Sequence, residues 1–113
     1  MPVRLHAAGR EHAAALIDAH QYVKDSDWSE AQPSAADENA FLESHGWDAY
    51  GAWHLAIDTD ETEGTKAHYK FPYGDFRRVH RSGLIAAEQR AAEWDYDDVE
   101  DAAAALLADV PAP

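Results

Sequence analysis

The stretch WDAYGAWHLAID, residues 47–58, fits two kinds of secondary structure. Its odd-numbered positions from Trp47 to Ile57 are mostly apolar, and such alternation is typical of a strand. Trp47, Tyr50 and His54 also follow the spacing of one helical face. Three alanines and the lack of a β-branched residue before Ile57 favour a helix. No second segment shows a convincing strand pattern to pair with it, so we predict a helix over 47–58, with a short strand as the alternative.

The segments on either side of this stretch have helical patterns. Apolar spacing predicts helices over 11–24, 35–45, 80–94 and 97–110. Ser34 with Asp37 forms a capping pair before the second helix, and Gly46 is placed to end it. Asp97 with Glu100 forms a second capping pair, and the short link before it makes the last two helices an αα-hairpin. The prediction is an all-α fold: one compact domain, residues 1–113, of four to five helices with a C-terminal αα-hairpin.

The segment YKFPYGDFRRVH, residues 69–80, combines aromatic, turn-forming and basic residues. Pro72, Gly74 and Asp75 favour a sharp turn that leads into the C-terminal hairpin. On that interpretation Asp75 caps a helix from about Phe76, or the helix begins only at about His80.

The charge is strongly negative and unevenly distributed. The net charge is −13, yet residues 66–90 hold six basic and two acidic residues. Residues 1–65 and 91–113 carry the negative charge, which repels phosphate backbones and anionic lipid. The last helix exposes acids and no base, which excludes it as a DNA recognition helix. The sequence therefore argues against double-stranded DNA as a partner.

Membrane and secretory features are missing from the sequence. There is no cysteine, no apolar signal-peptide core near the start and no apolar run of about 20 residues. A disulfide framework is thereby excluded, and the expected location is the cytoplasm, with no membrane contact.

The motifs of common enzymes and metal sites are also missing. The chain has no HExxH, GxSxG, GxxxxGK[ST] or GxGxxG pattern. The acidic residues 58–63 fail the EF-hand spacing, because position 6 is Glu63 and position 12 is Tyr69. We expect no metal and no cofactor, and the pattern leans against an enzyme. Catalysis would need a pocket that gathers His54 or His80 with a carboxylate of shifted pKa.

The remaining candidate for function is the basic aromatic island, residues 66–81. Arginine and tyrosine together are typical of interface hot spots. The predicted function is a non-enzymatic protein-interaction module, with a protein partner or a second copy of the chain. The alternative is a binding module for a small anionic ligand or single-stranded nucleic acid. A third interpretation is purely structural, with the aromatic side chains filling the core. The candidate binding residues are Tyr73, Arg77, Arg78, His80, Arg81, Trp28 and Trp53.

The sequence resembles a family of small, functionally uncharacterised bacterial proteins. The resemblance rests on HGWDAYGAWHLAID at 45–58, TKAHYKFPYGDFRRVHRSGLIAAEQRA at 65–91 and the DVEDAA start of the last helix. The order of acidic loop, YK-F-P segment, Ala-rich helix and final helix also looks like a helical module of tailed-phage head and prohead-protease-associated proteins. Both resemblances imply a compact helical module and transfer no catalytic residue.

Overall fold

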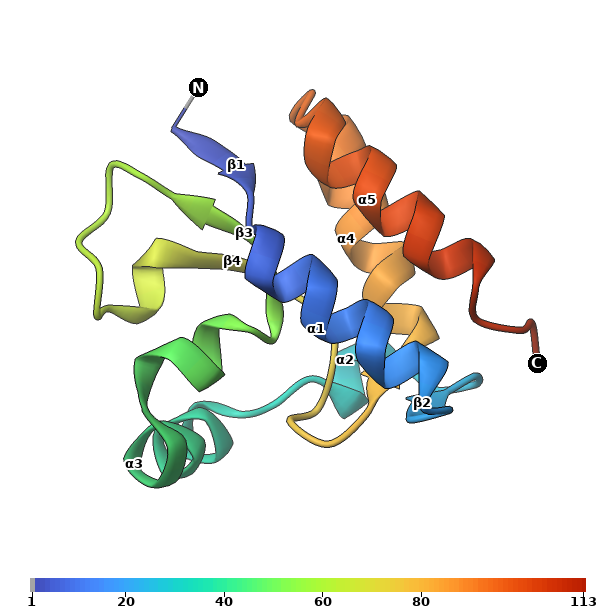
Figure 1. Ribbon diagram of the computed structural model, residues 1–113, viewed down its shortest axis with the longest axis horizontal. Coiled ribbons are helices and arrows are strands. Elements are labelled where there is room, and N and C mark those ends of the chain that lie inside the picture. Colours follow the sequence, from blue (N-terminus) through green and yellow to red (C-terminus); the bar gives the residue numbers. More distant parts are fainter. Residues whose placement is uncertain (1) are drawn as a thin grey trace.

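The computed structural model describes residues 2–113, which form both helices and strands (Figure 1). The elements are β1 (Val3–Leu5), α1 (Ala7–Asp18), β2 (Tyr22–Val23), α2 (Trp28–Ala31), α3 (Ala35–Gly51), β3 (His54–Asp58), the 3₁₀ turn η1 (Lys66–His68), β4 (Tyr69–Pro72), β5 (Val79–His80), α4 (Arg81–Glu93) and α5 (Asp97–Ala108).

The segment 47–58 contains both structures that its pattern allowed. Its first part completes α3 at Gly51, and His54–Asp58 form β3. β3 is the central strand of an antiparallel sheet with the order β1–β3–β4, so the predicted all-α fold is wrong. Leu55 and Ala56 of β3 are fully buried, and this burial between two partner strands outweighs the helical preference of the alanines.

The first helix begins at Ala7 and ends at Asp18, so both of its ends lie earlier in the chain than predicted. α1 ends at Asp18, and His20 takes the left-handed backbone conformation (φ 59°) that terminates a helix. Tyr22 and Val23 then pair in parallel with Val79 and His80, which forms a second, two-stranded sheet. The prediction that this helix runs to residue 24 is therefore wrong. The strand that pairs with Tyr22 and Val23 lies more than fifty residues further along the chain, so the local sequence pattern did not reveal it.

Of the two N-terminal caps predicted for later helices, one is present in the structure and the other is not. The capping box of Ser34 and Asp37 is confirmed, with both reciprocal hydrogen bonds at 3.1 Å. Gly46 has φ 84° and a non-helical backbone that divides α3 into two helical segments, so the predicted end of the first segment at Gly46 is confirmed, and the second segment continues to Gly51. The predicted cap at Asp97 is wrong, because α5 begins after Tyr96 without a side-chain cap. The hairpin of α4 and α5 lies where it was predicted.

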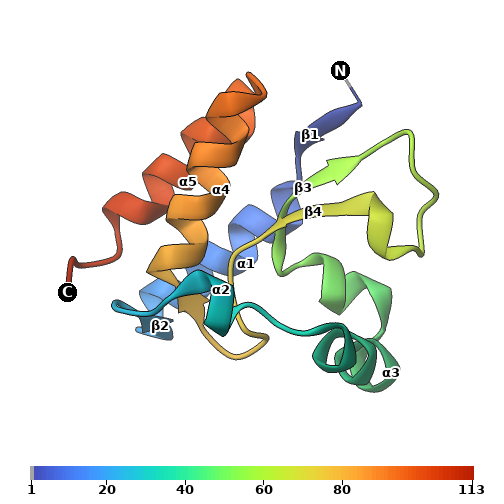
Figure 2. The ribbon, with the colours of Figure 1, turned by 180° about the vertical axis from the view of Figure 1, so that it is seen from behind.

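One hydrophobic core joins the sheet to the helices. α4 and α5 lie side by side, and α1 packs against both β3 and α5 (Figures 1 and 2). The core side chains come from all of these elements and include Ile17, Leu55, Leu84, Val99 and Leu106. In residues 2–113, no helix combines the length and the apolar character that a membrane crossing requires.

Candidate functional site

The aromatic residues at the centre of the island are part of the core. Tyr73 is 0% exposed, and its hydroxyl donates to the carbonyl oxygens of Ala52 at 2.6 Å and Gly9 at 3.3 Å. Trp53 is also buried, and its ring lies 5.7 Å from that of Tyr73. Tyr73 and Trp53 therefore hold α1, β3 and the turn together and are not accessible to a partner.

The three arginines of the island differ in their exposure to solvent. Arg77 and Arg78 are exposed, and their backbone N–H groups donate to Asp75 Oδ1 at 3.0 and 2.7 Å. Arg81 is half-buried, and its Nε atom is buried without a hydrogen-bond partner. The sequence predicted one surface from these residues, and the structure separates them.

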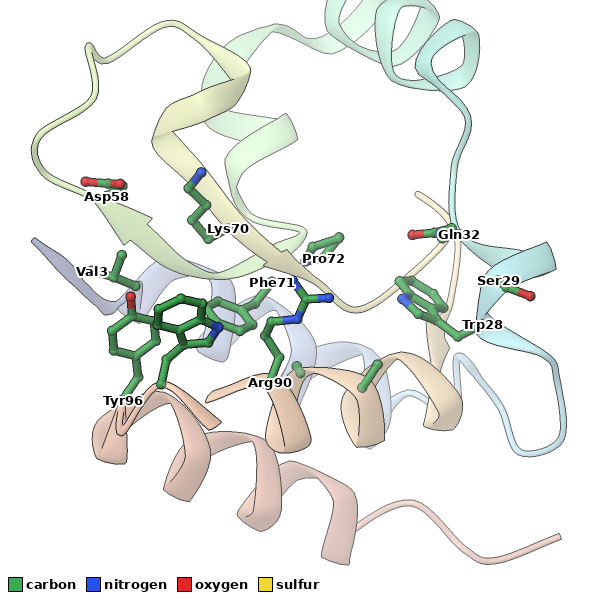
Figure 3. Close-up of a pocket in the computed structure, with 13 residues that line it drawn as sticks. Val3, Trp28, Ser29, Gln32, Asp58, Lys70, Phe71, Pro72, Arg90 and Tyr96 are labelled. Atoms are coloured by element: carbon green, nitrogen blue, oxygen red, sulfur yellow. The ribbon is translucent and has the colours of Figure 1, made fainter. Parts of the chain in front are cut away.

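A groove of about 650 Å³ lies between β4, α4 and α2 (Figure 3). Its volume lies within the range of about 300–1,000 Å³ that small-molecule sites occupy. Of the predicted residues, only Trp28 lines it. The lining residues are Val3, Trp28, Ser29, Gln32, Asp58, Lys70, Phe71, Pro72, Ala86, Ala87, Arg90, Trp94 and Tyr96.

The backbone of Phe71 shapes one wall of the groove. Successive side chains of a regular strand face opposite sides, but Lys70, Phe71 and Pro72 all line the groove. Phe71 has φ 61°, a left-handed conformation that is a genuine outlier for a bulky residue. In Figure 3 the Phe71 ring lies on the side of β4 that faces Tyr96 and Arg90, whereas the Lys70 side chain extends away from Arg90.

Two basic residues, Lys70 and Arg90, line the groove. Arg90 extends from α4 toward β4, which carries Lys70 (Figure 3). Within residues 2–113, neither side chain forms a salt bridge; the ion pairs there are Lys66 with Glu38 and His80 with Asp75. Asp58 is the only acidic residue among the groove-lining side chains, so the groove carries a net positive charge in a strongly acidic protein.

Aromatic side chains occupy both ends of the groove. Trp28 projects from α2 at one end, and Tyr96 lies at the other end (Figure 3). The Tyr96 ring meets the ring of Phe71 edge to face, with centroids 6.1 Å apart. Trp94 is 60% exposed and is the one large hydrophobic side chain in residues 2–113 that the fold leaves in solvent. Such aromatic surfaces suit a planar apolar ligand.

A hydrogen-bonded chain of side chains lies close to the Trp28 end of the groove. Ser26 Oγ lies 2.8 Å from His80 Nδ1, and His80 Nε2 lies 2.9 Å from Asp75 Oδ2. The Trp28 ring packs against the buried His80 ring at a centroid distance of 6.0 Å. Burial would raise the pKa of Asp75, but hydrogen bonds from His80 and from two backbone N–H groups outweigh it and lower the pKa. His80 is thus paired with a carboxylate of shifted pKa, one part of the condition for catalysis, but neither His80 nor Asp75 lines the groove.

The charged and aromatic side chains on which the groove depends, and which were not among the candidate binding residues, include Lys70, Phe71, Arg90, Trp94 and Tyr96. Lys70 and Arg90 lie within the basic segment 66–90, so the charge distribution contained a signal for them. That both residues line one groove depends on the pairing of β4 with β3, which the all-α prediction did not contain.

No known protein-family model, curated protein or solved structure matches this chain. The resemblances noted in the sequence therefore stay predictions. In residues 2–113, no three side chains of the metal-binding types lie close enough together to hold an ion.

Proposed function

We propose that the protein binds a small molecule that combines a planar ring with one anionic group, in the groove between β4, α4 and α2. The observation that carries this proposal is the pair of unpartnered cations, Lys70 and Arg90, among aromatic side chains. An anionic group between them would form charge-assisted hydrogen bonds, which are about twice as strong as neutral ones. The ring of the ligand would lie against Trp28, Phe71 or Tyr96.

The charge of the whole protein favours a small ligand over a nucleic-acid chain. The groove offers two basic side chains against Asp58, while the protein carries a net charge of −13. A polyanion would bring many phosphates into this negative field, and its affinity depends on the number of phosphates that are neutralised. One phosphate or carboxylate needs only the local pair of cations. Binding of single-stranded nucleic acid is therefore the less favoured outcome.

The four tryptophans provide a direct test. Trp28 and Trp94 line the groove, whereas Trp47 and Trp53 do not. We expect 1-naphthyl phosphate to shift the indole N–H signals of Trp28 and Trp94 in two-dimensional NMR spectra and to leave those of Trp47 and Trp53 in place. 1-Naphthol and inorganic phosphate, the two halves of the probe, should bind more weakly than the whole. A ten-nucleotide oligothymidylate tests whether the groove binds single-stranded nucleic acid.

A charge variant completes the test. Arg90→Gln should weaken binding of the probe roughly 10- to 100-fold, since a hydrogen bond to a charged group contributes about 1.5–3 kcal/mol. Arg10→Gln, which changes an exposed arginine of α1 outside the groove, is the matched control. The proposal fails if millimolar probe shifts no groove indole, if all four indoles shift alike, or if both variants bind as the unchanged protein does.

A second candidate function is contact between copies of the chain through Arg77 and Arg78. These exposed arginines form no salt bridge within residues 2–113, and the first turn of α5 carries Asp97, Asp98 and Glu100. Electrostatic complementarity between the two surfaces would support self-association.

For either function the cytoplasm is the location we propose, because a chain without cysteine has no disulfide to maintain.

A further inference from the structure

We propose that Ser26, His80 and Asp75 form a nucleophilic site that hydrolyses small carboxylic esters, with Ser26 as the nucleophile and His80 as its base. The three residues come from separate parts of the chain: the loop before α2, β5, and the turn after β4. Their side chains form one continuous chain of hydrogen bonds of 2.8 and 2.9 Å. Neither Ser26 nor Asp75 was among the candidate site residues from the sequence, because 54 residues separate Ser26 from His80.

The hydrogen bonds fix the direction in which a proton can move. The carboxylate of Asp75 only accepts hydrogen bonds, so His80 must carry its proton on Nε2. The Nδ1 atom of neutral His80 is then an acceptor, and the hydroxyl of Ser26 donates to it. A Ser–His–Asp hydrolase uses the same proton logic with the two ring nitrogens exchanged.

The surroundings hold this arrangement in place. The Asp75 side chain is held in position, because its Oδ1 atom accepts hydrogen bonds from the backbone N–H groups of Arg77 and Arg78. The backbone N–H of His80 donates to the carbonyl of Tyr73 at 3.0 Å. A base and its orienting carboxylate that are fixed in this way meet the geometric requirement for general-base activation of a hydroxyl.

The nucleophile lies beside a helix N-terminus and is partly open to solvent. Ser26 is half-buried, and its Oγ atom lies 2.9 Å from Oγ of Ser82, the second residue of α4. The first N–H groups of a helix have no partner within the helix and carry partial positive charge. Negative charge that develops on an acyl oxygen next to Ser26 would be stabilised there.

The reaction follows from these positions. Ser26 Oγ attacks the acyl carbon of the ester and transfers its proton to His80 Nδ1, while Asp75 stays ionised and stabilises the imidazolium. The bond between the acyl carbon and the leaving oxygen breaks, and that oxygen takes the proton from Nδ1. Water then attacks the acyl–Ser26 ester and gives one proton to Nδ1. Ser26 leaves with that proton, so the products are a carboxylic acid and an alcohol.

A fluorophosphonate probe tests this site without knowledge of the natural substrate. Attack by Ser26 on phosphorus would displace fluoride and leave a stable adduct, which mass spectrometry of peptides locates. We expect one adduct, on Ser26 alone of the five serines, in the native protein and not in protein unfolded by urea. The probe has neither a planar ring nor an anionic group, so its result is separate from that of the groove experiment.

Two variants distinguish catalysis from a structural role of the same hydrogen bonds. His80→Gln should slow the labelling of Ser26 by a factor on the order of 10²–10⁴, the usual contribution of a general base. Ser44→Ala, which removes an exposed hydroxyl on α3, should label at the unchanged rate. No adduct on Ser26 in the native, unsubstituted protein would overturn the proposal, whatever the fold of the variants. Equal labelling of several serines would overturn it as well.

Discussion

The stability of this protein should fall steeply between pH 6.5 and pH 4 because of His54. This side chain is 3% exposed in the central strand β3, and its Nδ1–H donates to the carbonyl of Tyr50 at 3.0 Å. Burial lowers the pKa of His54 from 6.5 to about 4, although the hydrogen bond to Tyr50 acts in the opposite direction. In this pH range the unfolded chain therefore binds a proton that the folded protein does not bind. The stabilisation is complete above pH 6.5 and is lost as the pH falls toward 4.

The size of the loss follows from the two pKa values. At about 1.4 kcal/mol per pH unit, the gap between 6.5 and about 4 corresponds to roughly 3 kcal/mol of unfolding free energy. Burial also lowers the pKa values of His6 and His12, which adds to the loss with the same sign. The measurement is urea unfolding followed by tryptophan fluorescence at pH 7, 5.5 and 4.

A variant isolates the contribution of this histidine. His54→Asn keeps an N–H near the position of Nδ1 but does not titrate, so the unfolding free energy should lose most of its dependence on pH between 6.5 and 4. His45→Asn changes an exposed histidine of α3 and should leave that dependence unaltered. If the His54→Asn protein keeps the full pH dependence, burial of His54 is not its cause and the reasoning is refuted.

Two further predictions separate scaffold from surface within residues 69–80. Tyr73→Phe removes the donor to two carbonyl groups and should cost about 1–3 kcal/mol, or several degrees of melting temperature. Tyr22→Phe, whose hydroxyl forms no hydrogen bond within residues 2–113, is the matched control and should change stability by less than about 0.5 kcal/mol. The double change Arg77→Ala/Arg78→Ala should leave the melting temperature unaltered, since both side chains are exposed and keep their backbone N–H bonds to Asp75. Light scattering with size-exclusion chromatography at low and high salt should show self-association only in the unsubstituted protein, and a monomer at all salts would remove the second candidate function.

Local signals in the sequence predicted those parts of the fold that depend on local interactions. The capping box at Ser34 and the apolar face of α5 need only residues within one helix and its immediate partner face. The sheet depends on pairing between residues far apart in the chain, such as Leu5 with Ala56 and Ala56 with Lys70. Strands of three and four residues are too short to show alternation, so β1 and β4 carried no readable pattern.

The site shows the same division between local and distant information. The charge distribution marked the segment that contains Lys70 and Arg90, and Trp28 was among the candidate binding residues. Tyr73 and Trp53 are buried, and the sequence did not reveal this because a large aromatic residue beside a turn has the same sequence signature in the core and on a surface. Ser26 could not be assigned to His80, since only the parallel pairing of β2 with β5 brings the loop after β2 to this histidine.

Two residues of the segment 69–80 have a strained backbone. Phe71 and Phe76 both have left-handed backbones, with φ of 61° and 68°, and each such conformation costs on the order of 1–3 kcal/mol. Packing holds both in place: Phe71 meets Tyr96, and the Phe76 ring stacks on Phe41 at 4.3 Å. A turn alone would use glycine at such positions at no steric cost. At these two positions the chain has phenylalanine in spite of the strain. The Phe71 ring lines the groove, and the packing of the Phe76 ring holds the turn that begins at Asp75. The strain therefore falls on the residues on either side of the buried Tyr73–Gly74 turn: Phe71 lines the groove, and Phe76 directly follows Asp75.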